Sequence, residues 1–424
     1  MPAGRISHLS TAGSPLANHH RADSWSPGLS IARLNAVAED GPFLVCDLDV
    51  IGRRYEELTD LLPGLNVFFA MKSNSAGPIL RTVRALGGSF EIASAAEMRM
   101  AEAAGAAPAD LLYSNPVKPP AHIAETAAAG VYRFAFDSEA ELRKLAAHAP
   151  GASVYARIRV DDHASLFPLS KKFGASAQAA GDLLLLAPEL GLVPYGVTFH
   201  VGSQCTNPMA WEGAVEQCGV ILRRLLRAGI RLEMLNIGGG LPARYTTPVP
   251  AMSLIASVIG EALGRLPYRP PLLAAEPGRY LVAESGVLGA SVIGVDQRDD
   301  ERWVYLDVGG YNGMMEAVQT GGRWHFPLLT SRSDHFLAPS VPTTVTGPSC
   351  DSSDTLFYDA PLPSTLEVGD RVYIGTTGAY TSSYASSFNG FPPPRLLYVN
   401  DRAAASPRPA PRLSRLGEPV AVAV

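Results

Sequence analysis

Residues 67–75, VFFAMKSNS, place a lysine directly after a run of apolar residues. This lysine, Lys72, is one of only five in the chain, because arginine supplies most of the positive charge. A short apolar run bounded by polar residues is typical of a buried β-strand. The lysine at its end either extends its ammonium group to water or is a desolvated amine kept for chemistry. The stretch alone leaves both interpretations open.

Seven similar runs follow this one, and they alternate with Ala- and Leu-rich helical stretches such as AAEMRMAEAAG and GAVEQCGVILRRLLRAG. The eight candidate strands are VFFAM (67–71), SFEIAS (89–94), LLYSN (111–115), RFAFD (133–137), VYARIRV (154–160), GVTFHVG (196–202), MLNIGGG (234–240) and LLAAEPG (272–278). Strand–helix units in series predict an α/β protein with a (β/α)₈ barrel of the TIM type. In such a barrel the site residues lie at the C-terminal ends of the strands.

Several of the candidate strands end in a polar residue. Lys72 ends the first strand, Asn115 the third and Asp137 the fourth, and His200 lies near the end of the sixth. Since the C-terminal ends of all eight strands meet at one rim, these polar ends predict a common functional site.

The pattern changes after about Ala283 to strand-like runs without long helices, such as RWVYLDVGG and DRVYIGTTG. We therefore expect a barrel over residues 47–283 and an all-β domain, a sandwich or barrel, over residues 284–400. Residues 30–46 are expected to join the β domain, although the apolar run GPFLVCDLDV (41–50) would also suit an added barrel strand.

The two ends of the chain differ from the rest in composition. Residues 1–29 are rich in Ser, Ala, His, Pro and Gly and contain no apolar core of a signal peptide, so we expect a disordered leader. Residues 401–424 have the Pro/Ala/Arg composition of a flexible tail.

The overall composition limits the kinds of binding partner that the chain can have. A net charge of −5 without a basic block argues against binding to nucleic acid or to a membrane surface. The four cysteines form no CxxC pair, which argues against a metal site or a disulfide framework and favours a cytoplasmic location.

Three consecutive glycines, Gly238, Gly239 and Gly240, follow the seventh strand. They form either a plain tight turn or a concavity of backbone N–H groups suited to phosphate oxygens. The eighth strand closes on Glu-Pro-Gly-Arg, which brings Arg279 to the same end of the barrel. Because barrel phosphate sites commonly form after strands seven and eight, we favour a phosphate site.

Glu276 ends the same strand, and a carboxylate in that position has to be paired. It either forms a salt bridge with Arg279 or keeps a proton on an aromatic ring nitrogen of a phosphorylated ligand. A lysine, a phosphate site and such a carboxylate are what a pyridoxal phosphate enzyme requires. His200 is either a core residue or stacks on the cofactor ring, and Ser203 is placed to donate to the phosphate.

Six motifs carry a family resemblance: AMKSN, FHVGSQ, NIGGG, EPGRY, GPSCDSSD and GAYT with FNGF. They occur in the order found in the pyridoxal-phosphate amino-acid decarboxylases of the alanine-racemase-like fold, and the chain resembles the ornithine and lysine decarboxylases most. The similarity extends from about residue 40 to about residue 400.

The resemblance implies a role for each matching residue. Lys72 would bond to the cofactor aldehyde, His200 would stack on its ring and Glu276 would pair with its ring nitrogen. Arg157 matches an arginine of the family's active site. The residues that would contact the phosphate are Ser203, Gly238, Gly239, Gly240, Arg279 and Tyr380.

The resemblance also implies a homodimer in which each subunit completes the active site of the other. Cys350 would lie near the substrate Cα as a proton donor, and Asp351 would bind the distal amine of the substrate. Phe388, in FNGF, would line the same pocket.

Two positions depart from the eukaryotic ornithine decarboxylases. Glu91, in FEIAS, stands where those enzymes carry Asp near the cofactor. Glu316 is the candidate for a second carboxylate on the substrate amine, through an alignment with a one-residue gap. The longer side chain would shorten the pocket and favour ornithine over lysine.

The resemblance implies decarboxylation of a basic L-amino acid, ornithine to putrescine or lysine to cadaverine. A diaminopimelate decarboxylase is the enzymatic alternative, although that family usually has Glu where this chain has Asp351. An alanine racemase would pair the ring nitrogen with Arg, which disagrees with Glu276. A non-catalytic homologue that binds the cofactor is the alternative of another class.

Overall fold

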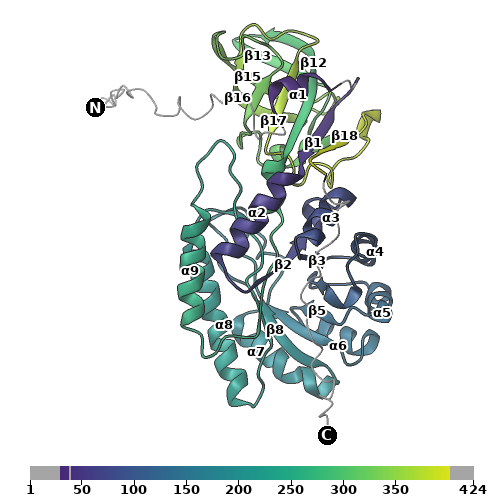
Figure 1. The fold of residues 1–424 in the computed structure, drawn as a ribbon, viewed down its shortest axis with the longest axis vertical. Coiled ribbons are helices and arrows are strands. Elements are labelled where there is room, and N and C mark those ends of the chain that lie inside the picture. Colours follow the sequence, from purple (N-terminus) through teal and green to yellow (C-terminus); the bar gives the residue numbers. More distant parts are fainter. Residues whose placement is uncertain (1–28, 38–39, 402–424) are drawn as a thin grey trace, which may run out of the picture.

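The computed structural model describes residues 29–37 and 40–401, which form a barrel with a sheet-rich domain above it (Figure 1). The predicted leader and tail fall almost entirely outside the described residues. Leu29, the last residue of the predicted leader, is buried. The predicted domain boundaries remain predictions, but the two-part architecture is clear from the strand pairing.

Eight parallel strands close the barrel in the order β10-β11-β2-β3-β4-β5-β6-β8. The strands are β2 (Leu65–Ala70), β3 (Ser89–Ile92), β4 (Leu112–Tyr113), β5 (Arg133–Phe136), β6 (Ser153–Arg157), β8 (Val193–Thr198), β10 (Met234–Asn236) and β11 (Leu272–Ala275). All eight predicted strands are present. The predicted runs extend one to four residues past the strand ends, because the chain there turns away from the barrel and forms the rim.

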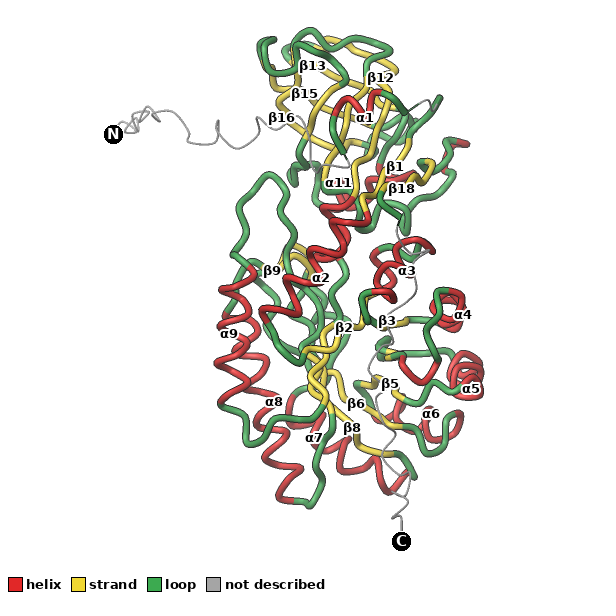
Figure 2. The backbone as a smooth tube through the Cα atoms, viewed as in Figure 1, coloured by secondary structure: helices red, strands yellow, loops and turns green. Residues whose placement is uncertain are grey.

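Helices surround the barrel on its outside (Figure 2). They are α2 (Leu48–Leu61), α3 (Gly77–Ala85), α4 (Ala95–Ala103), α5 (Pro120–Ala129), α6 (Glu139–His148), α7 (Ala177–Leu186), α8 (Met209–Arg227) and α9 (Met252–Gly264). The short α10 (Arg279–Val282) lies at the junction with the β domain. A small antiparallel pair, β7 (Ser165–Phe167) with β9 (Ser203–Cys205), lies outside the barrel order and was not predicted.

The opening apolar run is buried on both sides, as parallel barrel strands are. Phe68 belongs to the cluster inside the barrel, with Tyr155 and Met234. Val67 and Phe69 belong to the main core between the barrel and its helices. This alternation explains why the run contains no polar residue before Lys72.

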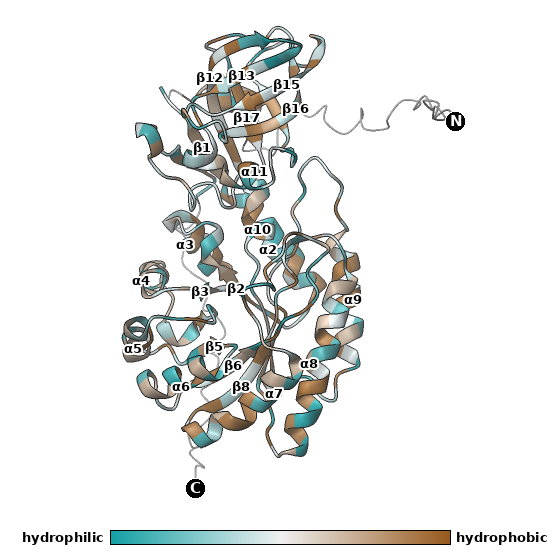
Figure 3. Cartoon of the chain, turned by 180° about the vertical axis from the view of Figure 1, so that it is seen from behind, coloured by the Kyte–Doolittle hydropathy of each residue, from teal (hydrophilic) through white to brown (hydrophobic). Residues whose placement is uncertain are grey.

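The outer helices are amphipathic, and α8 carries hydrophilic and hydrophobic residues side by side (Figure 3). Its buried residues include Trp211, Val215, Leu222 and Leu225, which recur at helical spacing. Gly229 follows the helix with φ +78°, a conformation that suits glycine at a helix C-terminus.

The second domain is built on an eight-stranded sheet with the order β14-β17-β12-β13-β15-β16, and with β1 and β18 attached through β12. The strands are β1 (Phe43–Asp47), β12 (Gly286–Arg298), β13 (Glu301–Leu306), β14 (Leu328–Thr330), β15 (Ser340–Thr346), β16 (Thr355–Pro363), β17 (Arg371–Gly375) and β18 (Arg395–Val399). The helices α1 (Ile31–Asn35) and α11 (Met315–Gln319) accompany them.

The placement of β1 decides between the two expectations for this segment, in favour of the β domain. Its backbone pairs antiparallel with β12 and parallel with β18, so residues 43–47 are not an added barrel strand. Phe43 lies across from Gly289 and packs with Leu329 and Tyr373 of the β domain. The hydrophobic surface that accepts this strand belongs to the sheet, which the apolar run itself does not reveal.

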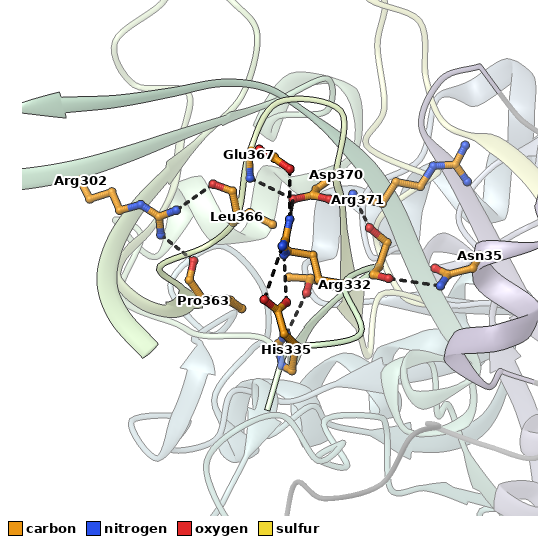
Figure 4. Close-up of polar contacts among 12 residues, drawn as sticks. Asn35, Arg302, Arg332, His335, Pro363, Leu366, Glu367, Asp370 and Arg371 are labelled. Carbon is orange, nitrogen blue, oxygen red and sulfur yellow. Dashed lines mark hydrogen bonds and ion pairs between the residues drawn. The ribbon is translucent and has the colours of Figure 1, made fainter. Parts of the chain in front are cut away.

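Arg332 anchors a loop of the β domain through three carboxylates (Figure 4). Its guanidinium lies 2.9 Å from Asp334, 3.1 Å from Asp370 and 3.3 Å from Glu367. The neighbouring Ser331 accepts a hydrogen bond from the Asn35 side chain, which ties α1 to the same loop.

Within residues 29–37 and 40–401, none of the helices combines the length and the apolar character needed to cross a bilayer.

The packing of Phe43 on Gly289 generates a prediction about stability. A Cβ at Gly289 would lie 2.3 Å from Phe43 Cζ, so Gly289→Ala should lower the free energy of unfolding by about 1–3 kcal/mol. Gly260, on the exposed side of α9, has no atom within 4 Å of the position that an added Cβ would take, and Gly260→Ala should raise it by about 0.5–1 kcal/mol. Urea unfolding measures both, and equal effects of the two substitutions would refute this account of the packing.

Candidate active site

Lys72 lies on a short 3₁₀ turn, η2 (Met71–Ser73), directly after β2. Two contacts with the β domain fix this turn. The Asn74 side chain donates to Gly378 O at 2.8 Å, and the Tyr380 N–H donates to Ser73 O at 2.7 Å. The β domain therefore holds, across the domain junction, the turn that presents the lysine.

The Lys72 amine pairs with a buried carboxylate. Lys72 Nζ donates to Glu91 Oε2 at 3.0 Å, and Glu91 is 3% exposed at the end of the neighbouring strand β3. The Lys72 side chain is 44% exposed along its length. Desolvation of the amine by nearby protein groups lowers the pKa of Lys72, but the charges of Glu91, Tyr380 and Glu276 outweigh this effect and raise that pKa above its ordinary value. A lysine that only extends into water would have no such partners, so this alternative is disfavoured.

Glu276 ends β11 and is 8% exposed. Its Oε1 accepts hydrogen bonds from Ser114 Oγ at 2.5 Å and from Asn236 Nδ2 at 2.6 Å. Burial raises the pKa of Glu276, and the like charge of Glu91 raises it further. Among the described residues its other oxygen, Oε2, has no hydrogen-bond partner, which leaves that oxygen for a ligand.

The expected alternative of a Glu276–Arg279 salt bridge is wrong. Arg279 is 3% exposed and forms a two-point ion pair with Glu316, at 2.6 Å and 2.8 Å. It also donates to Tyr245 Oη and to Ser203 Oγ. Glu276 therefore lies at the C-terminal end of the barrel and is not ion-paired with Arg279, the arginine of its own turn.

The three glycines lie against the end of β8. A Cβ at Gly238 would lie 1.9 Å from Phe199 O, and one at Gly240 would lie 2.3 Å from Gly202 O. The Gly238 N–H is used by Asn236 Oδ1, whereas the N–H groups of Gly239 and Gly240 make no hydrogen bond to any described residue. Two consecutive free N–H groups suit an anion.

His200 lies beside these glycines. Its Nε2 is 3.1 Å from the Cβ position of Gly239, and its Nδ1 accepts the Gly202 N–H at 3.0 Å. Burial, followed by the charges of Arg157 and Lys72, lowers the pKa of His200 well below its ordinary value. The ring is therefore neutral, and its free N–H is on Nε2.

Arg157 and Tyr380 complete the group near Lys72. The Arg157 guanidinium lies over the Phe173 ring at 5.3 Å, and burial lowers its pKa despite the nearby carboxylates. Tyr380 adopts φ +58° and lies 4.8 Å from the Arg279 guanidinium.

The remaining predicted residues form a separate group in the β domain. Asp351 accepts a hydrogen bond from Tyr311 Oη at 2.6 Å, and the Cys350 thiol donates to Asn389 Oδ1 at 3.3 Å. The Tyr311 and Phe388 rings lie 4.4 Å apart. The Tyr311 hydrogen bond lowers the pKa of Asp351, so this group carries a carboxylate. No contact among the described residues joins it to Lys72.

Glu316 does not lie where it was expected. Both of its oxygens are bound to Arg279, and no contact in the described part of the chain joins it to Asp351. This ion pair disfavours the expected contact of Glu316 with the substrate amine and the expected shortening of the pocket, which both remain untested predictions. A nearby buried guanidinium, which the sequence spacing did not reveal, decides the orientation of the carboxylate.

Three residues of this site were missed at the level of sequence. Ser114 and Asn236 hold Glu276, and Tyr245 holds Arg279. Ser114 directly precedes Asn115, and Asn236 lies two residues before Gly238. Both follow or end a barrel strand, so their position at the rim could have identified them as site residues. Tyr245 lies in an irregular segment and gave no signal.

The comparisons with known proteins agree with this geometry. Residues 48–283 match the family described as pyridoxal-dependent decarboxylase, pyridoxal binding domain. A lysine/ornithine decarboxylase from Selenomonas ruminantium is 36% identical over 355 residues, which cover 82% of this chain and 87% of that protein.

The chain belongs to the family of pyridoxal-dependent decarboxylases.

Solved structures resemble this decarboxylase along most of its length. Two structures of a lysine/ornithine decarboxylase from Vibrio vulnificus, one with putrescine and one with cadaverine, have TM-scores of 0.79 and 0.80 at 32% identity. Each covers 88% of this chain and 98% of the other. A lysine decarboxylase from Selenomonas ruminantium has a TM-score of 0.80 at 34% identity over 88% of this chain and 96% of the other.

The residues present in this decarboxylase fit pyridoxal phosphate. An ion-paired primary amine, a carboxylate with one unpartnered oxygen and two consecutive free N–H groups surround the same end of the barrel. A neutral imidazole lies beside the glycines. These are the amine, the acid partner and the phosphate donors that this cofactor needs.

A second carboxylate behind Glu91 generates a pH-dependent prediction. Glu97 lies in the first turn of α4 and accepts the Ala93 N–H at 2.6 Å. Burial, followed by the charge of Glu91, raises the pKa of Glu97 from 4.5 to about 7. Because the folded-state pKa is the higher one, the protonated carboxyl stabilises the fold fully below pH 4.5, and this contribution is lost as the pH rises through about 7.

Glu97→Gln keeps an acceptor for Ala93 and removes the charge. The variant should be more stable than the unsubstituted protein by about 1–2 kcal/mol at pH 8 and equally stable at pH 4.5, measured by urea unfolding. Glu102→Gln, on the exposed side of the same helix, is the control and should show no such pH dependence. A stability difference for Glu97→Gln that is the same at both pH values would contradict the account of a half-buried carboxyl with a raised pKa.

Proposed function

We propose that this protein catalyses the pyridoxal-phosphate-dependent decarboxylation of a basic L-amino acid, either ornithine to putrescine or lysine to cadaverine. The observation that carries the proposal is the Lys72 amine, 3.0 Å from the buried Glu91, at the same barrel end as Glu276. Glu276 is oriented by Ser114 and Asn236. The known structures with putrescine and cadaverine support these products.

Each residue of the barrel end has a role in this chemistry. Bound pyridoxal phosphate withdraws electrons from the substrate Cα, which lets the carboxylate leave as carbon dioxide. Lys72 supplies the amine that holds the cofactor, and Glu276 holds a proton on the ring nitrogen. His200, which is neutral, supports the ring without adding a competing positive charge.

The group around Asp351 gives the proposal its substrate class. Asp351 is a carboxylate whose partners are the hydroxyls of Tyr311 and Ser353, so a distal ammonium group would find a negative charge there. Phe388 supplies apolar surface for the methylene chain. Cys350 carries an S–H that can deliver a proton to Cα after carbon dioxide has left.

We also propose a homodimer with shared active sites. Cys350 is exposed and Asp351 is partly exposed, and within one chain they do not contact the Lys72 group among the described residues. A reactive thiol and a carboxylate that lie apart from the barrel site of their own chain have a function if they complete the active site of a second copy.

The four free thiols, Cys46, Cys205, Cys218 and Cys350, support a cytoplasmic location as part of the proposal.

The diaminopimelate alternative is less well supported. Its substrate ends in a second carboxylate, which would need a cation near Asp351. Among the described residues no Lys or Arg contacts Asp351. A terminal ammonium is therefore the better match to this end of the site.

Decarboxylation is tested by measuring carbon dioxide from L-ornithine, L-lysine, L-arginine and meso-diaminopimelate with pyridoxal phosphate present. We expect release from ornithine or lysine, and at least a roughly 10³-fold loss in Lys72→Ala, because the residue that holds the cofactor is removed. Lys171→Ala, at an exposed lysine, is the control and should keep its activity. No release from any of the four would refute the decarboxylase and favour a non-catalytic homologue.

The shared site is tested by co-expressing two inactive subunits, Lys72→Ala and Asp351→Ala. A mixed dimer contains one site with both wild-type residues, so about a quarter of the activity should return if subunits pair at random. Hybrid activity no greater than that of the two parents would contradict the shared-site proposal. Sedimentation of the unsubstituted protein reports the dimer independently.

A further inference from the structure

The Arg279–Glu316 ion pair joins the two domains beside the glycine turn. Arg279 is the first residue of α10 at the end of the barrel, and Glu316 lies on α11 of the β domain. Arg279 Nη2 lies 2.6 Å from Glu316 Oε1, and Nη1 lies 2.8 Å from Oε2. The two residues are 3% and 8% exposed, so little water screens the pair.

The hydrogen-bond donors of Arg279 are already engaged. Besides the two bonds to Glu316, Nη1 donates to Tyr245 Oη at 2.9 Å, and Nε and Nη2 donate to Ser203 Oγ at 3.2 Å and 3.1 Å. These five bonds match the five N–H groups of a guanidinium. A phosphate group can therefore gain a direct bond from Arg279 only if a protein partner gives one up.

Aromatic rings hold the guanidinium in place. Its central carbon lies 4.8 Å from the Tyr380 ring centre, 5.3 Å from that of Trp324 and 5.4 Å from that of Phe167. Rings at these distances stabilise a cation and restrict its movement. Ser203 Oγ accepts from Arg279, which leaves the serine O–H available to donate to a ligand.

We propose that Glu316 is an internal counter-anion of Arg279, which keeps the guanidinium on Ser203 and limits the affinity of the neighbouring phosphate site. The cofactor phosphate is then held mainly by the Gly239 and Gly240 N–H groups and the Ser203 hydroxyl. This inference rests on the proposed cofactor site and assigns to Glu316 a positioning role in place of contact with substrate.

The sign of the effect follows from electrostatics. Without Glu316, a buried guanidinium lacks its counter-charge in the cofactor-free protein, and a bound phosphate supplies the missing negative charge. The same change removes the repulsion between the carboxylate and the phosphate. Both effects make phosphate binding more favourable when Glu316 is neutralised.

The experiment compares pyridoxal phosphate with pyridoxal, which lacks the phosphate, in absorbance titrations of cofactor-free protein. Glu316→Gln should lower the Kd for pyridoxal phosphate at least about tenfold and change that for pyridoxal by less than about threefold. Glu316→Asp keeps the charge and should stay within about threefold of the unsubstituted protein for both ligands.

Glu284→Gln is the matched control. Glu284 is also an ion-paired glutamate near the domain junction, 2.6 Å from Arg54, but it does not contact Arg279 among the described residues. The Glu284→Gln variant should leave the ratio of the affinities for pyridoxal phosphate and pyridoxal unchanged. A Glu316→Gln variant with unchanged or weaker affinity for pyridoxal phosphate, or with an equal change for pyridoxal, would overturn the proposal.

Thermal unfolding with inorganic phosphate separates this proposal from the proposed function. Phosphate should raise the Tm of Glu316→Gln more than that of the unsubstituted protein, even if neither protein decarboxylates an amino acid. If Glu316→Gln folds only when phosphate is present, this result also supports the proposal, because the phosphate anion then supplies the negative charge that the carboxylate supplied. Equal effects of phosphate on both proteins, or a variant that phosphate does not rescue, would contradict the counter-anion role.

Discussion

The burial of negative charge at the end of the barrel is the constraint on which the rest of the site depends. Glu91 and Glu276 are 3% and 8% exposed, and two such carboxylates are costly unless cations and donors surround them. Lys72 compensates Glu91 directly, and Ser114 and Asn236 bind one oxygen of Glu276. This arrangement explains why the lysine follows an apolar strand: the rigid strand places the amine where the carboxylates need it.

The same principle operates at the phosphate side of the site. Arg279 is buried among aromatic rings and is neutralised by a carboxylate from the other domain. The contacts of Asn74 and Tyr380 across the domain junction hold the lysine turn in a similar way. The β domain therefore contributes to the barrel site in two ways: it fixes the turn that carries Lys72, and it supplies the counter-charge of Arg279.

Much of this could be predicted from the sequence, because the decisive features are local. The strand runs, the polar residue at each strand end and the glycines are read along the chain, and together they predicted the barrel and its functional end. The missed features depend on partners distant in sequence. The ion pair of Glu316 with Arg279 links residues 37 positions apart. For residues 43–47 the sequence left two possibilities, and the pairing of β1 with β12 selects the expected one, the β domain.

The central claim is that Lys72, of the five lysines in the chain, is the amine that holds the cofactor. The most direct measurement is to load the protein with pyridoxal phosphate, reduce it with borohydride and locate the added mass by peptide mapping. The account predicts that the label lies on the peptide containing Lys72, in a stoichiometry near one per chain. A label on Lys118, Lys144, Lys171 or Lys172, or no stable label at all, would contradict it.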